Sequence, residues 1–342
     1  MRSHLLYILP FVALLQSCSK TLPLPSTDSQ NAIVMIGELV AEENAALRAG
    51  QTIGVNVNGS KQIAALGDLS LSIKDENGAD IAMSGMEDSL TSKLKTIPFT
   101  ANIQLQPKHS YTLTARHSKL GTANVTVPIP QPFTARLISA IPVQFSGEDV
   151  VKFTIQIDDP QGEDIYSIEC VKQQINVTGE FQYKGQWLDI PTNYFLYDSL
   201  RQQNHATATR YDTTFYNVLS REYMYTSDPN TDNVQANTTT YAYSHILLKD
   251  TKFNGGQYTT EVYARKTDFN STLFNGQLVL MVKSISKDYY TYLGQYEGTT
   301  SYTFSSNDVP ATIKGNVANG FGIVGGAYKR QFNYVVDDVF PY

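Results

Sequence analysis

The chain has 342 residues, more than most single domains hold, so its length favours two domains. Charged residues make up only 17% of it, whereas Tyr (22) and Phe (15) are frequent, and this composition favours pleated β structure over helix. The net charge of −6 lacks the basic footprint of a nucleic-acid-binding protein. We therefore expect no nucleic-acid partner.

The N-terminus has the pattern of an export signal. After a short polar start with Arg2, an apolar run extends from Leu5 to Leu15 and is followed by a small residue just before Cys18. The run is too short to span a bilayer, and a charged start, an apolar core and a small residue at the cleavage point are typical of signal peptides. We assign residues 1–17 to a signal peptide.

The cleavage point itself resembles a bacterial lipobox, Leu15-Gln16-Ser17-Cys18, in which the cysteine is lipidated and becomes the first mature residue. Gln16 is not among the commonest residues at its position, and the alternative is an ordinary signal peptide followed by a chance cysteine. Acyl chains on Cys18 would anchor the protein to a membrane, since each buried methylene contributes ~0.8 kcal/mol. No later apolar segment approaches the length of a transmembrane helix, so we expect an anchored protein rather than a membrane-spanning one.

The only other cysteine is Cys170. With Cys18 lipidated, neither a disulfide framework nor a cysteine metal cluster can form. Cys170 lies in an apolar stretch with Ile165 and Ile168, which favours a small buried core residue over a nucleophile.

The next part of the chain predicts a tether and a first β domain. Residues 18–30 hold two prolines among polar residues, as flexible tethers do. Residues 31–130 contain short alternating segments separated by turn signals, among which 75–78 (Asp-Glu-Asn-Gly) is a hairpin candidate. This spacing predicts an immunoglobulin-like β-sandwich. Its expected strands are 33–39, 52–57, 69–73, 111–115 and 123–127.

A second, larger domain is expected after three closely spaced prolines, Pro128, Pro130 and Pro132. Prolines cannot donate to a sheet ladder, so they mark a domain boundary or a stiff linker. Residues 135–342 are expected to form a β-rich domain with long loops and few short helices, which makes the predicted fold class all-β. Its expected strands are 150–157, 166–177, 244–249, 257–266 and 276–285, with a short helix at 287–293.

Two acidic segments are considered as calcium ligands. Asp158, Asp159 and Asp164, with Glu163, could chelate calcium, but a solvated loop between strands is the favoured interpretation. The segment 228–233 offers oxygens at alternate positions, as calcium loops do. It lacks the loop glycine and the final glutamate, so an Asx-rich turn is favoured there.

Other chemistry has weaker support. His109 and His117 flank one expected strand without further ligands nearby, so we interpret them as surface or turn histidines. The glycines of 320–326 lack the strand–loop–helix context of a nucleotide site and are expected to serve tight bends. No Gly-x-Ser-x-Gly occurs, so no serine sits in a nucleophile elbow. With these interpretations we expect no catalytic set, no metal and no cofactor. A distant pair of acidic residues for glycan hydrolysis stays open.

Tyrosines cluster in the weakly periodic segment 190–243, which is expected to hold long loops and short helices. Tyrosine offers rigid contact area with a polar end and is enriched in recognition surfaces. A recognition surface is one interpretation, and packing of long loops is the other. The candidate residues are Tyr194, Tyr197, Tyr211, Tyr216, Tyr223, Tyr225, Tyr241 and Tyr243.

Several local patterns, in their order and spacing, resemble the domain-of-unknown-function 4249 family of Bacteroidota lipoproteins. They lie at 111–113, 123–130, 158–160, 164–166, 248–255 and 315–326. The resemblance covers nearly the whole mature chain. It implies an immunoglobulin-like N-terminal domain, a larger β-rich C-terminal domain and an outer-membrane location beside a TonB-dependent transporter. It supplies no catalytic residues.

The sequence therefore predicts a lipid-anchored outer-membrane lipoprotein that works by binding, with a membrane contact through Cys18 and a protein partner. The alternatives are an envelope adhesin or structural scaffold and, third, a glycan or peptide hydrolase. The segment 19–22 lacks the acidic stretch that often accompanies surface display, which leaves the orientation open. Neither the ligand nor the identity of the partner follows from the sequence.

Overall fold

A computed structural model of the chain describes residues 31–52, 66, 68–75, 78, 80–86, 96–203, 208–233, 242–265, 275–300 and 314–335. The predicted signal peptide, Cys18 and the tether lie outside these residues. Within the described ranges, helix is limited to α3 (Tyr194–Gln202), α4 (Lys287–Thr300) and a 3-10 turn (Asp250–Lys252). Strands make up most of the rest, so the predicted all-β fold is confirmed.

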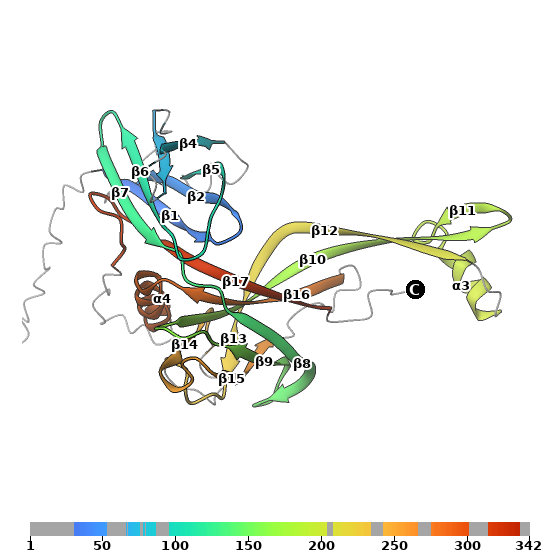
Figure 1. The fold of residues 1–342 in the computed structure, drawn as a ribbon. Helices are drawn as coiled ribbons and strands as arrows, with labels where there is room; N and C mark the ends of the chain where they lie inside the picture. The colour runs from blue at the N-terminus through green and yellow to red at the C-terminus, as the bar shows by residue number, and fades with distance from the viewer. Residues whose placement is uncertain are drawn as a thin grey trace, which may run out of the picture.

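The N-terminal part is a sandwich-like arrangement of antiparallel strands (Figure 1). Strand pairing runs in the order β1-β2-β5-β4-β3-β6-β7, with β4 pairing to strands on both sides. Alternate residues of β6, such as Tyr111 and Leu113, point into the core, as the period of two predicts. The strands are β1 (Ile33–Val40), β2 (Asn44–Gln51), β3 (Ser70–Lys74), β4 (Asp80–Gly85), β5 (Thr96–Gln104), β6 (Ser110–His117) and β7 (Gly121–Pro128).

The predicted hairpin at 75–78 is confirmed between β3 and β4. The Gly78 amide donates to Asp75 Oδ1 at 3.0 Å, and Gly78 has a φ of +90°, which glycine adopts without strain. The expected strand at 52–57 lies outside the described residues from 53 onward.

The C-terminal part contains two groups of strands. A four-stranded antiparallel sheet has the order β13-β15-β9-β8. A second group is centred on β10, which pairs with β14 and β16 and, farther along, with β12 and β11. The bounds are β8 (Thr134–Phe145), β9 (Glu148–Asp158), β10 (Ile165–Tyr183), β11 (Gln186–Asp189), β12 (Thr209–Glu222), β13 (Met224–Thr226), β14 (Ile246–Lys249), β15 (Gln257–Arg265), β16 (Asn275–Ile285) and β17 (Val324–Val335).

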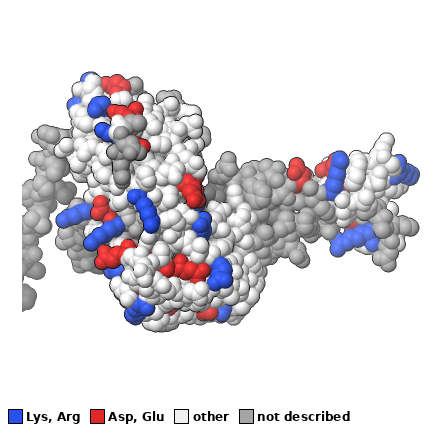
Figure 2. Space-filling view, in the orientation of Figure 1, with Lys and Arg blue, Asp and Glu red and all other residues white. Residues whose placement is uncertain are grey.

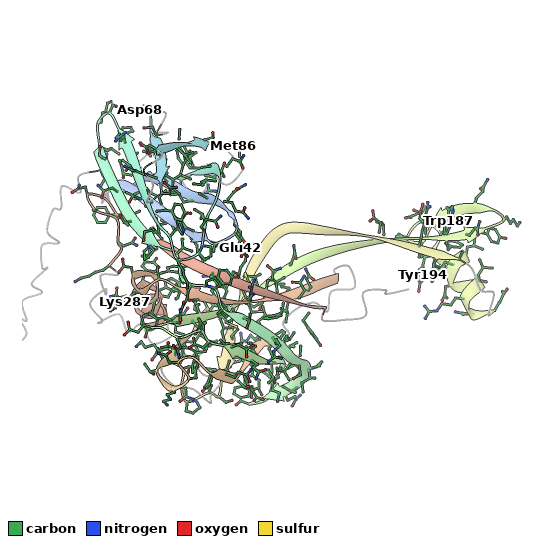
Figure 3. All side chains as sticks on the ribbon, in the orientation of Figure 1. Glu42, Asp68, Met86, Trp187, Tyr194 and Lys287 are labelled. Carbon is green, nitrogen blue, oxygen red and sulfur yellow. The ribbon has the colours of Figure 1, made fainter. Side chains whose placement is uncertain are left out.

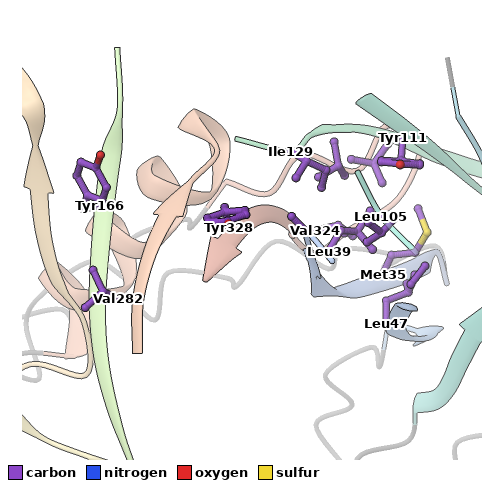
Figure 4. Close-up of a cluster of buried hydrophobic side chains, with 14 of the residues drawn as sticks. Met35, Leu39, Leu47, Leu105, Tyr111, Ile129, Tyr166, Val282, Val324 and Tyr328 are labelled. Atoms are coloured by element: carbon purple, nitrogen blue, oxygen red, sulfur yellow. The ribbon is translucent and has the colours of Figure 1, made fainter. Parts of the chain in front are cut away.

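The two parts are joined by strand β17, which pairs antiparallel with β16 and parallel with β1. The proline-rich segment does connect β7 to β8, but the main sheet continues across both parts. One hydrophobic cluster also contains side chains of both, for example Met35 and Leu105 from the first and Tyr166 and Val282 from the second (Figure 4). The parts therefore share a sheet and a core.

A long two-stranded arm leaves this body (Figure 1). The pairing of β10 with β16 ends at Ile175, whereas the pairing of β10 with β12 continues to Phe181. At the far end β10 also pairs with β11, and α3 follows. We call residues 176–214 the arm and residues 180–210 its tip.

Candidate functional site

The tip has a hydrophobic cluster of its own. Phe181, Ile190 and Tyr197 are buried there, and the rings of Phe181 and Tyr197 lie 5.3 Å apart between centroids. Leu188 and Leu196, among others, pack against them. The apolar face of α3 is thereby fixed against the β10–β11 hairpin, so the tip is a small folded head rather than a bare turn.

Large aromatic side chains on this head face solvent. Phe195 is 90% exposed, Tyr194 43% and Trp187 39%. The guanidinium of Arg210 lies 4.4 Å above the Trp187 ring and also forms an ion pair with Glu180. Figure 3 places Trp187 and Tyr194 at the end of the arm. We call Trp187, Tyr194 and Phe195 the tip aromatics.

Exposed aromatics of this kind are unusual, because burying a ring of this size stabilises a protein by a few kcal/mol. Trp, Tyr and Arg are also the residue types most enriched among residues that dominate binding energy at protein interfaces. The tip therefore has the composition of a binding surface.

The predicted tyrosine surface does not form as one site. Tyr197, Tyr225 and Tyr243 are buried, so the recognition-surface interpretation is wrong for these three and the packing interpretation holds. Tyr194 is exposed at the tip, whereas Tyr223 is exposed on the body beside β13. Tyr211 and Tyr216 lie on β12 with side chains outside the description, and Tyr241 lies outside the described residues.

Sequence reasoning missed Trp187 and Phe195, because it weighed tyrosines alone. The signal that could have found Trp187 was its place two residues after the Lys184-Gly185 pair, where positive φ values at both residues form the β10–β11 turn. Nothing in the local pattern distinguishes Phe195 from a core residue.

A group of three buried carboxylates lies outside the arm, in the loops after β9 and β14. Oxygens of Asp159, Asp164 and Asp250 lie within 4.8 Å of one another. Burial raises the pKa of Asp159 and Asp164, and the neighbouring carboxylates add to it. The favoured interpretation as a solvated loop is wrong for Asp159 and Asp164, and Asp250 was missed because it is distant in sequence.

Oxygens of this group could hold a hard divalent cation, but protein donors already engage them. Tyr166 donates its hydroxyl to Asp159, whose other oxygen accepts from the Gly255 amide at 2.8 Å. The Gln131 amide donates to Asp164 at 2.7 Å. These hydrogen bonds connect three loops, and we interpret the group as a structural element that stabilises the loops against one another.

A second buried polar network joins the N-terminal strands to the arm's base. Lys283 on β16 forms ion pairs with Glu169 on β10 and, at 2.6 Å, with Glu38 on β1. Burial, the largest single effect, would raise the pKa of Glu169, but the charge and hydrogen bond of Lys283 together with the charges of His245 and Arg221 outweigh burial and lower that pKa. Burial likewise opposes the charge on Lys283, but Glu38 and Glu169 raise its pKa.

The same network continues to α4. His245 Nδ1 lies 2.7 Å from Glu297 Oε1, and Glu297 also accepts from the backbone amides of Ser244 and His245. Carboxylates and histidine can exchange protons, but Glu169, His245 and Glu297 are all buried. We therefore interpret the network as a structural contact that holds the N-terminal and C-terminal parts together.

Three smaller predictions are confirmed. Cys170 is buried, and burial raises the pKa of its thiol, as expected for an inert core cysteine. Asp228 forms an Asx turn, because its Oδ1 accepts from the Asn230 amide at 2.9 Å. His117 is a turn histidine whose Nδ1 accepts from the Lys119 amide at 3.1 Å.

Within the described ranges, no helix has the length and apolar character needed to cross a membrane. The search of curated proteins returns no match for this chain. The model of one protein family, described as "Domain of unknown function (DUF4249)", matches residues 20–332. That range includes the body, the arm and the tip, so the chain belongs to the DUF4249 family, as its motifs predict.

Proposed function

We propose that this protein is a lipid-anchored outer-membrane lipoprotein that works by binding a membrane protein, as an accessory to a TonB-dependent nutrient transporter. The observation that carries the proposal is the arm, which extends from the body and ends in a small head with exposed aromatics. A two-stranded ribbon gains little stability by itself, so its length is better explained by reach than by folding.

The lipobox at Cys18 supports the membrane location, and the predicted tether of 18–30 gives the body room to turn toward a partner. A protein held at the membrane meets other membrane proteins at high effective concentration, so a modest interface suffices for association.

The anchor gives a direct prediction. Cys18→Ala should move the protein from the membrane fraction to the soluble fraction, because the acyl chains supply the membrane affinity. Fractionation of cells followed by immunoblotting measures this. Cys170→Ala is the matched control and should stay with the membrane, since Cys170 is buried in the core. Persistence of the Cys18→Ala protein in the membrane would refute the lipid anchor.

The partner is tested by isolating a C-terminally tagged chain from mildly solubilised membranes. The proposal predicts stoichiometric recovery of a membrane protein, and a transporter would make its cargo the ligand to examine. Recovery of the lipoprotein alone, under conditions that keep a known complex intact, would argue against an accessory role and favour an adhesin or scaffold.

A further inference from the structure

We infer that the tip aromatics insert into an apolar pocket of a partner protein rather than into a lipid bilayer. This inference rests on the proposed function and identifies its contact site and the chemistry of its partner. Three features of the tip carry it: charge balance, the packing of the tip and the exposure of Phe195. The direction of the strands adds the reach of the arm.

Strand direction places the tip far from the tether. Strand β1 is parallel to β17, and β16 is antiparallel to both β17 and β10, so β1 and β10 run the same way. Val40, at the end of β1, pairs with Ala327, which in turn pairs with Ile285 near the start of β10. The tip therefore lies roughly 60 Å from this end of the body, at ~3.3 Å per residue of β10 from Ile165 to Tyr183, and Ile33 lies on the other side of Val40.

The reach of the arm exceeds that of the tether. Residues 18–30 span at most ~45 Å when fully extended. When the body stands away from the membrane, the tip can therefore contact an integral membrane protein whose exposed domain lies beyond the length of the tether.

Charge balance disfavours a lipid surface. Proteins that dock on anionic membranes carry an excess of Lys and Arg around their apolar residues. Residues 180–210 instead contain equal numbers of basic and acidic side chains, and Figure 2 shows both signs along this end of the molecule. The charged residues are Lys184, Arg201, Arg210, Glu180, Asp189 and Asp198.

The packing of the tip suits insertion into a preformed pocket. Phe181 and Tyr197 hold α3 in place, and Arg210 holds the Trp187 ring from one side. Side chains that are ordered before binding lose less entropy on association, which raises affinity. The phenyl ring of Phe195, which is 90% exposed, fits a concave apolar site, the usual environment of a dominant aromatic contact.

The test uses photo-cross-linking in the full chain within its native membranes. The photo-reactive analogue p-benzoylphenylalanine replaces Phe195 in one version and Phe321 in the other. Phe321 is the matched control, because it is 59% exposed but belongs to the body. We expect one discrete adduct, formed at position 195 only, with the protein that co-isolates with the wild type.

Adducts of position 195 with lipid, or with a second copy of this chain, would overturn the inference. So would equal cross-linking from positions 195 and 321. If the wild type co-isolates with a membrane protein that position 195 never cross-links, the proposed function survives and the contact site is wrong. If the wild type co-isolates with nothing, the proposed function itself fails.

Affinity measurements with the purified protein and its purified partner give the contribution of Phe195 to binding. Phe195→Ser should weaken binding to the identified partner at least tenfold, as loss of a dominant aromatic contact does, whereas Phe321→Ser should change it less than twofold. Both variants should unfold at the wild-type temperature, because neither side chain is in the core. Equal affinities of the two variants would contradict the inference.

Discussion

Replacing Lys283 by methionine is expected to destabilise the protein by about 3–5 kcal/mol, the usual cost of removing one partner from a buried ion pair. The change leaves the carboxylates of Glu169 and Glu38 without their shared ammonium group, in a place where Glu169 is buried. Methionine keeps the volume of the aliphatic chain, so the loss of stability comes from the missing charge and not from a cavity. Urea-induced unfolding measures the free energy of unfolding of both proteins.

Lys329→Met is the matched control. Lys329 on β17 lies directly opposite Lys283 in the β16–β17 ladder. Its ammonium group forms an ion pair at 2.5 Å with Glu43, a residue of the N-terminal part. Glu43 is about half exposed, so solvent screens this pair. Its loss should cost less than ~1 kcal/mol. Similar losses in both variants would show that Lys283 is not the centre of a buried network.

The pH dependence follows from the directions of the two pKa shifts. The lowered pKa of Glu169 gives stability that is present above its usual value of 4.5 and is lost as pH falls through the folded-state value. The raised pKa of Lys283 gives stability that is present below its usual 10.5 and is lost as pH rises through the folded-state value. The difference in free energy of unfolding between wild type and Lys283→Met should therefore be largest between pH 4.5 and pH 10.5 and should shrink in acid.

Gly322→Ala is expected to cost about 3 kcal/mol or more, because it combines backbone strain with a collision. Gly322 has a φ of +104°, and a Cβ there would lie 2.1 Å from the carbonyl oxygen of Met35 on β1. A main-chain atom cannot rotate away. The segment before β17 would have to separate from β1 and weaken the bond from the Met35 amide to the Phe321 carbonyl, now 3.0 Å.

Gly147→Ala is the control that separates the cost of backbone strain from the cost of the collision. Gly147 also has a positive φ, +86°, but a Cβ there meets nothing within 4 Å. Only the conformational cost remains, about 1–2 kcal/mol. Thermal unfolding of both variants gives the comparison. An equal loss at the two positions would mean that the close approach of Gly322 to β1 contributes nothing to stability.

The sequence predicted the strands whose two faces differ. β6, β7 and β9 alternate between buried and exposed residues, and so each appears as a period of two. Helix α4 was also predicted at its start and proved longer. These elements lie over a core, which is what produces the periodic signal.

The arm gave no such signal. Beyond Ile175 the strands β10 and β12 form a ribbon without a sheet to cover, so neither face needs to be apolar and β12 was not predicted. Strand β17 was hidden for another reason: its start contains Gly325 and Gly326, which weaken strand propensity but allow Tyr289 and Pro128 to approach closely.

The candidate sites depend on contacts between distant residues. Asp250 and Lys283 acquire their partners only through pairing across the sheets, and spacing along the chain carries no trace of it. The exposure of Phe195 could not be predicted either, because an apolar side chain normally indicates a buried position. The proposed binding role of the arm rests on the three-dimensional structure, in which the tip aromatics are exposed.

The central claim is that the arm carries the binding function, and co-isolation with and without the arm tests it most directly. Asn-Gly can replace residues 176–214, since Ile175 and Phe215 are a cross-strand pair that a two-residue turn can close. We predict that the shortened chain stays folded and membrane-bound but loses the membrane protein recovered with the whole chain. Recovery of that protein at unchanged stoichiometry would contradict the account.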